Sequence, residues 1–107
     1  MKRCIVGICR PEDQSHSAVG PGQPSVWFPS MATMAAVLSE DNRALLRVIR
    51  DQRPKSLTAL AALTGRRVPN LSRSLRMMEG YGLVRLKRDA HGVEPEALAT
   101  SFKILID

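Results

Sequence analysis

One short stretch of the chain, residues 66–76, combines arginines with side chains that can hydrogen-bond to nucleic acid. Its polar members are Arg66, Arg67, Asn70, Ser72, Arg73, Ser74 and Arg76. A guanidinium group makes paired hydrogen bonds to phosphate or to guanine O6 and N7, and an asparagine amide fits an adenine edge. Serine hydroxyls can hydrogen-bond to phosphates or to bases. These residue types at this density predict a surface that both holds a phosphate backbone and reads bases.

The distribution of charge favours the same interpretation. Sixteen Lys and Arg residues against ten Asp and Glu residues give the 107-residue chain a formal charge of +6. The window from Pro54 to Arg88 holds eight of these cations and a single acid, Glu79, so it alone carries +7. The positive field is therefore concentrated on one stretch of sequence, as is typical of a surface that binds polyanions.

Catalysis and metal binding find little support in the sequence. It contains no His/Asp/Ser grouping, no glycine-rich phosphate loop and no carboxylate pair suited to one pocket. Cys4, Cys9 and His16 offer three metal ligands but no fourth at zinc-finger spacing. We therefore expect a protein that is not an enzyme and binds no cofactor or metal. Because a secretory segment and a long apolar run are missing, we expect a cytoplasmic, nucleoid-associated protein without membrane contact.

The first 25 residues differ in composition from the rest of the chain. Four of the seven prolines and three of the seven glycines lie within the first 29 residues. Such a density of breakers interrupts any helical or alternating period. We predict a flexible arm over residues 1–25 and one domain over residues 26–107. Residues 26–29 would form an apolar clip that docks onto this domain or onto a second copy.

Helical spacing of apolar residues begins at Met31. We predict three or four helices: residues 31–38, a helix after the N-cap Ser39 that stops before Pro54, residues 57–64, and residues 69–80. Ser56 or Thr58 would cap the third helix, and Gly65 would end it in the left-handed conformation. Pro69 suits the first turn of the fourth helix.

Alternating apolar and basic residues after Gly82 predict strands. We expect a hairpin over residues 83–95 and a final strand over residues 102–106, and we leave residues 96–101 open between strand and helical turn. Two helices around a tight turn, followed by a basic hairpin, are typical of a winged helix-turn-helix. The predicted fold is mainly α with a small β-hairpin, an α+β class, with a two- to three-stranded wing.

In this fold the helix at residues 69–80 would enter the major groove of double-stranded DNA, and the hairpin would form the wing. The predicted base-reading residues are Pro69, Asn70, Arg73 and Ser74. The predicted phosphate contacts are Lys55, Thr58, Arg66, Arg67, Ser72 and Arg76, and the predicted wing contacts are Lys87, Arg88 and His91.

One reading helix covers only a few base pairs, so useful specificity calls for two half-sites and a homodimer. Large apolar side chains near both ends of the predicted domain could form the contact between two copies. The candidate interface residues are Trp27, Phe28, Met31, Met34, Phe102 and Ile104.

Four segments carry a resemblance to a known family: residues 38–50, residues 56–65, the run Asn70-Leu-Ser-Arg-Ser-Leu, and Glu79-Gly-Tyr-Gly-Leu-Val. Over residues 28–107 the chain resembles small prokaryotic winged-helix regulators of the MarR-like group. The resemblance implies sequence-specific DNA binding as a homodimer, with a role in transcriptional repression. Some members of the group are antitoxin components, which leaves open a protein-interaction module that binds a toxin-like partner through its arm.

Overall fold

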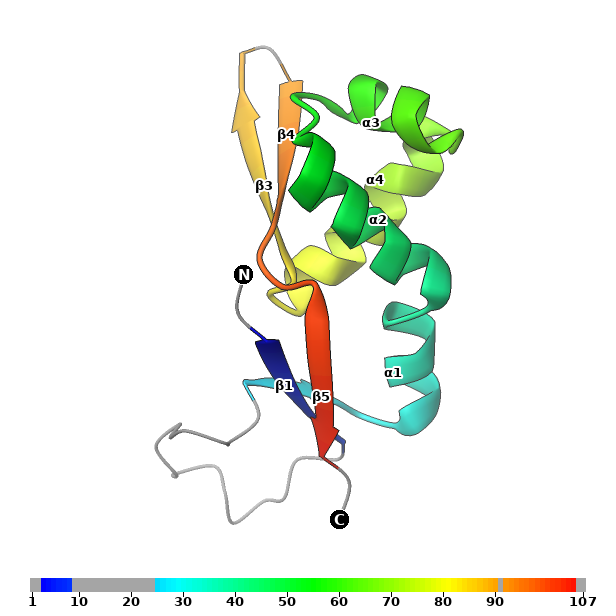
Figure 1. Ribbon diagram of the computed structural model, residues 1–107, viewed down its shortest axis with the longest axis vertical. Helices are drawn as coiled ribbons and strands as arrows, with labels where there is room; N and C mark the ends of the chain where they lie inside the picture. Colours follow the sequence, from blue (N-terminus) through cyan, green and yellow to red (C-terminus); the bar gives the residue numbers. More distant parts are fainter. Residues whose placement is uncertain (1–2, 9–24, 91, 106–107) are drawn as a thin grey trace.

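The computed structural model describes residues 3–8, 25–90 and 92–105. Within them, four helices and five strands form an α+β fold with principal dimensions of 44 × 25 × 20 Å. Three of the helices and a β-hairpin occupy one end, and a small parallel sheet with the first helix beside it occupies the other (Figure 1). None of the described helices combines the length and the apolarity needed to cross a bilayer.

Serine caps separate the first two helices, α1 (Met31–Val37) and α2 (Glu40–Gln52). The Ser39 hydroxyl accepts a hydrogen bond from the Asn42 backbone N–H at 3.2 Å, as the predicted N-cap requires. The Asn42 side chain is buried and donates to the Val37 carbonyl at 3.1 Å. This contact satisfies a carbonyl at the end of α1 and joins the two helices.

Helices α3 (Leu57–Thr64) and α4 (Val68–Gly80) follow with only three residues between them. Ser56 caps α3 by accepting a hydrogen bond from the Ala59 backbone N–H at 3.0 Å, so Ser56 rather than Thr58 is the N-cap. Gly65 ends α3 at a φ of 72°, where a side chain would be strained. Pro69 lies in the first turn of α4, where its missing N–H costs no helical hydrogen bond.

Strands β3 (Val84–Asp89) and β4 (Gly92–Ala97) form an antiparallel hairpin. Its register pairs Val84 with Ala97, so the hairpin extends two residues beyond the predicted end at residue 95. This register resolves part of the segment that the sequence left open. Leu86 and Pro95 are paired and buried, and they hold the hairpin against the helices.

Three strands make the parallel sheet, in the order β2 (Val26–Phe28), β1 (Arg3–Ile8) and β5 (Ser101–Leu105). The prediction of a flexible arm is wrong for Arg3–Ile8, because this segment precedes the prolines and finds partners on both sides. Val6, in its centre, pairs with Val26 and with Ile104 and is fully buried. Residues 9–24, which include Cys9 and His16, lie outside the described residues.

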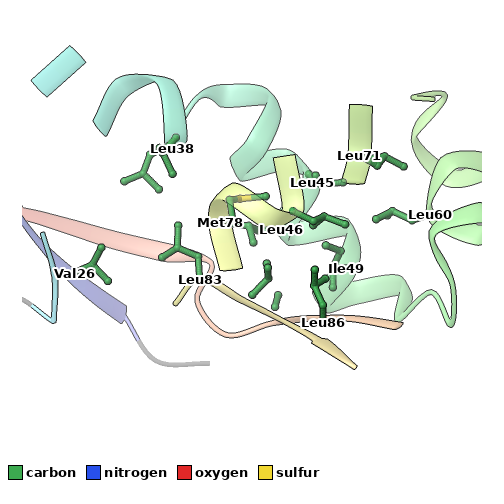
Figure 2. Close-up of a cluster of buried hydrophobic side chains, with 14 of the residues drawn as sticks. Val26, Leu38, Leu45, Leu46, Ile49, Leu60, Leu71, Met78, Leu83 and Leu86 are labelled. Atoms are coloured by element: carbon green, nitrogen blue, oxygen red, sulfur yellow. The ribbon is translucent and has the colours of Figure 1, made fainter. Parts of the chain in front are cut away.

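The hydrophobic core lies between α2, α3, α4 and the hairpin and continues to the sheet (Figure 2). Phe28 is 1% exposed, and its ring lies 4.5 Å from that of Tyr81, centroid to centroid. Residues 26–28 therefore dock onto their own domain, which was one of the two predicted alternatives. Burial of these apolar groups stabilises the relative positions of α3, α4 and the hairpin.

Candidate nucleic-acid interface

Helix α4 has one buried face and one exposed face. Leu71, Leu75 and Met78 follow each other at intervals of four and three residues, and each is 0% exposed. Packing of this apolar stripe turns the opposite side of the helix outward. The residues exposed on that side are Pro69, Asn70, Arg73, Arg76 and Met77. The structure thus brings three of the four predicted base-reading residues onto one open surface.

Asn70 and Arg73 on this face are joined to each other. One Nη2 hydrogen of Arg73 is donated to Oδ1 of Asn70. The two residues are one helical turn apart, a spacing at which side chains on a helix surface meet. The predicted adenine reader and the predicted guanine reader are therefore in contact before any ligand binds.

Two more arginines flank this pair. Arg67 occupies the N-cap position of α4 and makes no capping hydrogen bond with its side chain. Arg76 lies on the exposed face, further along the helix. Among the described residues, neither side chain forms an ion pair with a carboxylate. The positive end of the α4 dipole lies beside Arg67 and adds to the attraction for phosphate.

Arg66 and Ser74 were predicted to contact DNA, but the structure directs them toward each other. Nη2 of Arg66 donates to Oγ of Ser74 at 3.0 Å, and both residues are half-buried. The Arg66 side chain thus holds the turn between α3 and α4 against the flank of α4. Ser72 is also half-buried, on the opposite flank. These three residues lie beside the exposed face rather than in its centre.

The cations of the hairpin are paired with carboxylates. Lys87 Nζ lies 3.1 Å from Glu96 Oε2, and Arg85 lies 3.7 Å from the same oxygen. Arg88 lies 3.3 Å from Glu79 Oε1. Glu79 therefore pairs with Arg88 rather than with Arg76, which lies three residues before it on α4. The hydrogen bond and charge of Lys87 hold the pKa of Glu96 below the usual range of a glutamate. The predicted wing is therefore locally neutralised.

The charges of the hairpin also cancel in number. Strands β3 and β4 contain three cations, Arg85, Lys87 and Arg88, and three acids, Asp89, Glu94 and Glu96. His91, the remaining predicted wing contact, lies outside the described residues.

The two predicted phosphate contacts near the start of α3 have different surroundings. Lys55 is largely exposed, and its Nζ lies 3.6 Å from Glu94 Oε2. Thr58 is exposed in the first turn of α3 and leaves its capping position to Ser56. The charge of Lys55 is therefore offset by a carboxylate of the hairpin, whereas the Thr58 side chain is exposed to solvent.

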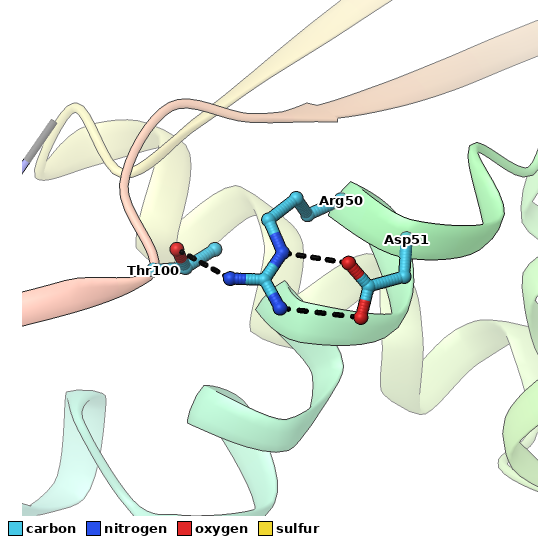
Figure 3. Close-up of polar contacts among 3 residues, drawn as sticks. All are labelled: Arg50, Asp51 and Thr100. Atoms are coloured by element: carbon cyan, nitrogen blue, oxygen red, sulfur yellow. Dashed lines mark hydrogen bonds and ion pairs between the residues drawn. The ribbon is translucent and has the colours of Figure 1, made fainter. Parts of the chain in front are cut away.

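Arg50 has a structural role that the sequence did not reveal (Figure 3). Its Nε donates to Asp51 Oδ1 at 2.7 Å, and its Nη1 donates to Thr100 Oγ1 at 3.2 Å. The hydrogen bond from Arg50 lowers the pKa of Asp51. Arg50 thereby links the end of α2 to the connection between β4 and β5. Nothing local in the sequence relates positions 50 and 100.

The candidate dimer residues divide into buried and exposed groups. Phe28 lies in the core and is removed from the candidate interface. Trp27 is half-buried and covers Gly7, where a Cβ would come within 2.5 Å of the indole ring. Met31 is 52% exposed and Ile104 is 41% exposed. Met34, Phe102 and Ile104 line a hollow of about 570 Å³ between the first two helices and β5.

The described residues contain no group of three or more His, Cys, Asp or Glu side chains that could hold a metal ion. The profile of the HVO_A0114 family matches residues 37–104, from the end of α1 into β5. No curated protein and no solved structure matches the chain.

Proposed function

We propose that this chain, which belongs to the HVO_A0114 family, binds double-stranded DNA as a transcriptional regulator of the MarR-like winged-helix type, acting as a repressor. Helix α4 would lie in the major groove, and the hairpin would lie beside it as the wing. The single observation that carries the proposal is the exposed face of α4. It presents Asn70, Arg73 and Arg76 outward while its opposite face is fully buried.

The dimensions and chemistry of α4 support this role. The major groove is about 12 Å wide and admits one helix with its side chains. Arg67 and Arg76 would contact phosphates and fix the register of the protein, and Asn70 and Arg73 would contact base edges. An enclosed α4, or one whose arginines were all held by carboxylates, would have no such surface to offer.

The hairpin would contribute less than its sequence suggests. A phosphate that approaches Lys87 or Arg88 has to compete with Glu96 or Glu79, which already lie 3.1 and 3.3 Å away. The net attraction from the hairpin is therefore small, and the field that draws DNA comes mainly from α4 and the turn before it.

We also propose that two copies act together, so that two α4 helices read two half-sites. Met31, Ile104 and Leu105 are large apolar side chains left exposed on α1 and β5. Their burial between two copies would stabilise a dimer. Sedimentation velocity of the full chain at micromolar concentration tests this part, and a monomer would contradict dimerisation without affecting DNA binding.

The experiment that tests the proposed function is selection of bound sequences from a random duplex pool at two salt concentrations. We expect enrichment of a defined half-site and an affinity that falls with salt. Arg67/Arg73/Arg76→Ala should abolish retention. The control Arg43/Arg47/Arg53→Ala removes the same charge from exposed positions on and just after α2.

Equal losses in the two triple variants would show a general charge effect and contradict a reading surface on α4. If the wild type retains no more DNA than Arg67/Arg73/Arg76→Ala, the proposal is wrong and a protein-interaction module becomes the better hypothesis.

A further inference from the structure

The hydrogen bond between Asn70 and Arg73 determines how the asparagine amide is oriented. A guanidinium group carries five N–H donors and no acceptor, so only Oδ1 of Asn70 can face it. The bond runs from Arg73 Nη2 to Asn70 Oδ1. The Nδ2 amino group of Asn70 must therefore point away from Arg73. Because the arginine has no acceptor, flipping the amide would break the contact rather than preserve it.

This orientation conflicts with the usual way in which asparagine reads adenine. That contact needs Oδ1 to accept from adenine N6 while Nδ2 donates to N7. In this structure Arg73 donates a hydrogen bond to Oδ1, so its positively charged guanidinium group lies beside the only acceptor atom of the Asn70 side chain. The adenine amino group, itself a donor, would have to compete with a charge-assisted hydrogen bond. Together the two residues thus offer donors and little acceptor capacity.

Nearby polar groups do not draw Arg73 out of this contact. Glu79, on the same helix, is paired with Arg88 at 3.3 Å. The Ser74 hydroxyl, next to Arg73, is bonded to Arg66 at 3.0 Å. Among the described residues, Arg73 forms no ion pair. The Asn70–Arg73 contact is therefore the arrangement that incoming DNA would meet.

A surface that offers only donors matches guanine better than any other base. In the major groove guanine presents two acceptors, N7 and O6, whereas adenine presents one acceptor and one donor. We propose that Asn70 and Arg73 act as one donor unit that selects guanine, including at the position where an independent asparagine would select adenine. This inference rests on the proposed function, since it names the base that the same surface of α4 reads.

The test compares the sequences that four proteins select from a random duplex pool: the wild type, Asn70→Ala, Arg73→Ala and Arg43→Ala. In the wild type we expect guanine over adenine by at least about fivefold at two positions of the half-site. Asn70→Ala should lose the preference at one of them. Arg73→Ala should lose the preference at the other and convert the Asn70 position from guanine to adenine, because Oδ1 is released.

Arg43→Ala is the control, since it removes one exposed arginine from α2, outside the proposed DNA surface, and it should leave both guanines in place. Thermal unfolding should show that all four proteins fold alike, because the altered side chains are exposed. Adenine at the Asn70 position in the wild type overturns the inference. So does a preference at that position that Arg73→Ala leaves unchanged. Either result would leave DNA binding intact, whereas failure of the proposed function would appear as no enriched sequence at all.

Discussion

Helix α4 with its N-cap and the β3–β4 hairpin each contribute three cations to the same basic stretch of sequence, yet the two regions differ in structure. In the helical region Arg67, Arg73 and Arg76 form no ion pair among the residues that the structure describes. In the hairpin Arg85, Lys87 and Arg88 all lie within 3.7 Å of a carboxylate oxygen. Equal numbers of cations therefore do not give equal positive fields.

The difference comes from which residues each kind of element brings into contact. The antiparallel register places Glu96 directly opposite Arg85, and such cross-strand neighbours interact. A helix instead brings together only residues three or four positions apart. Within α4 the sole acid is Glu79, and Arg88 holds it. A count of charges along the sequence thus overestimates the field of a hairpin more than that of a helix.

The largest expected effect separates the two regions directly. We expect Arg67/Arg73/Arg76→Ala to weaken binding to a random 20-base-pair duplex by roughly 100-fold at low salt. The slope of log affinity against log salt concentration should fall by about 0.9 for each phosphate that is no longer neutralised. Lys87→Ala/Arg88→Ala/Glu79→Gln/Glu96→Gln removes two hairpin cations together with their carboxylate partners, so it leaves the net charge unchanged and should weaken binding by less than about threefold. Fluorescence anisotropy measures both, and similar losses would show that the hairpin contributes as much as α4.

A smaller effect should separate base reading from phosphate contact within the helical region. Arg73→Ala should cost roughly 1–3 kcal/mol of binding free energy on the selected sequence and relax its preference. Arg67→Ala should weaken selected and random duplexes equally and lower the salt slope by about 0.9. Titrations of both variants against both duplexes provide the measurement. Identical behaviour of the two variants would contradict this division of roles.

Removing one acid should make the hairpin behave more like α4. Glu96→Gln releases Lys87 and Arg85 from their shared carboxylate, so we expect affinity for a random duplex to rise by roughly two- to fivefold. Glu40→Gln, on α2, is the matched control because it changes the net charge equally and leaves the hairpin pairs in place. A comparable rise in the control would mean that net charge, not release of the hairpin cations, determines affinity.

The smallest expected effect is on stability at acid pH. Lys87 lowers the pKa of Glu96 in the folded protein. This carboxyl therefore stabilises the folded state at a pH above its unfolded pKa, and the contribution is lost as the pH falls through the folded pKa. Thermal unfolding at about pH 6 and about pH 3 should show a slightly larger loss for the wild type than for Glu96→Gln. The difference stays small because the pair is exposed to solvent, and an equal loss would argue against the pair.

The candidate site was predictable wherever its determinants are local. Ser39, Ser56 and Gly65 mark helix ends through hydrogen bonds and backbone angles within a few residues, so the predicted helices agree closely with the observed ones. The outward position of Asn70 and Arg73 likewise follows from the apolar stripe on α4. The contact of Arg66 with Ser74 was missed, because an arginine in a turn carries no local signal of where its long side chain will lie.

The sequence by itself determined the helices, the hairpin and the exposed face of α4, because caps, prolines and the 3.6-residue period act over one or two turns of chain. Only the tertiary structure decided that Arg3–Ile8 is a central strand and that the hairpin cations are neutralised. Arg3 pairs with Ser101, near the other end of the chain, and Arg88 contacts Glu79 on the preceding helix. Such partners meet only when different elements pack together, and the residue pattern within one element does not predict which other element it will contact.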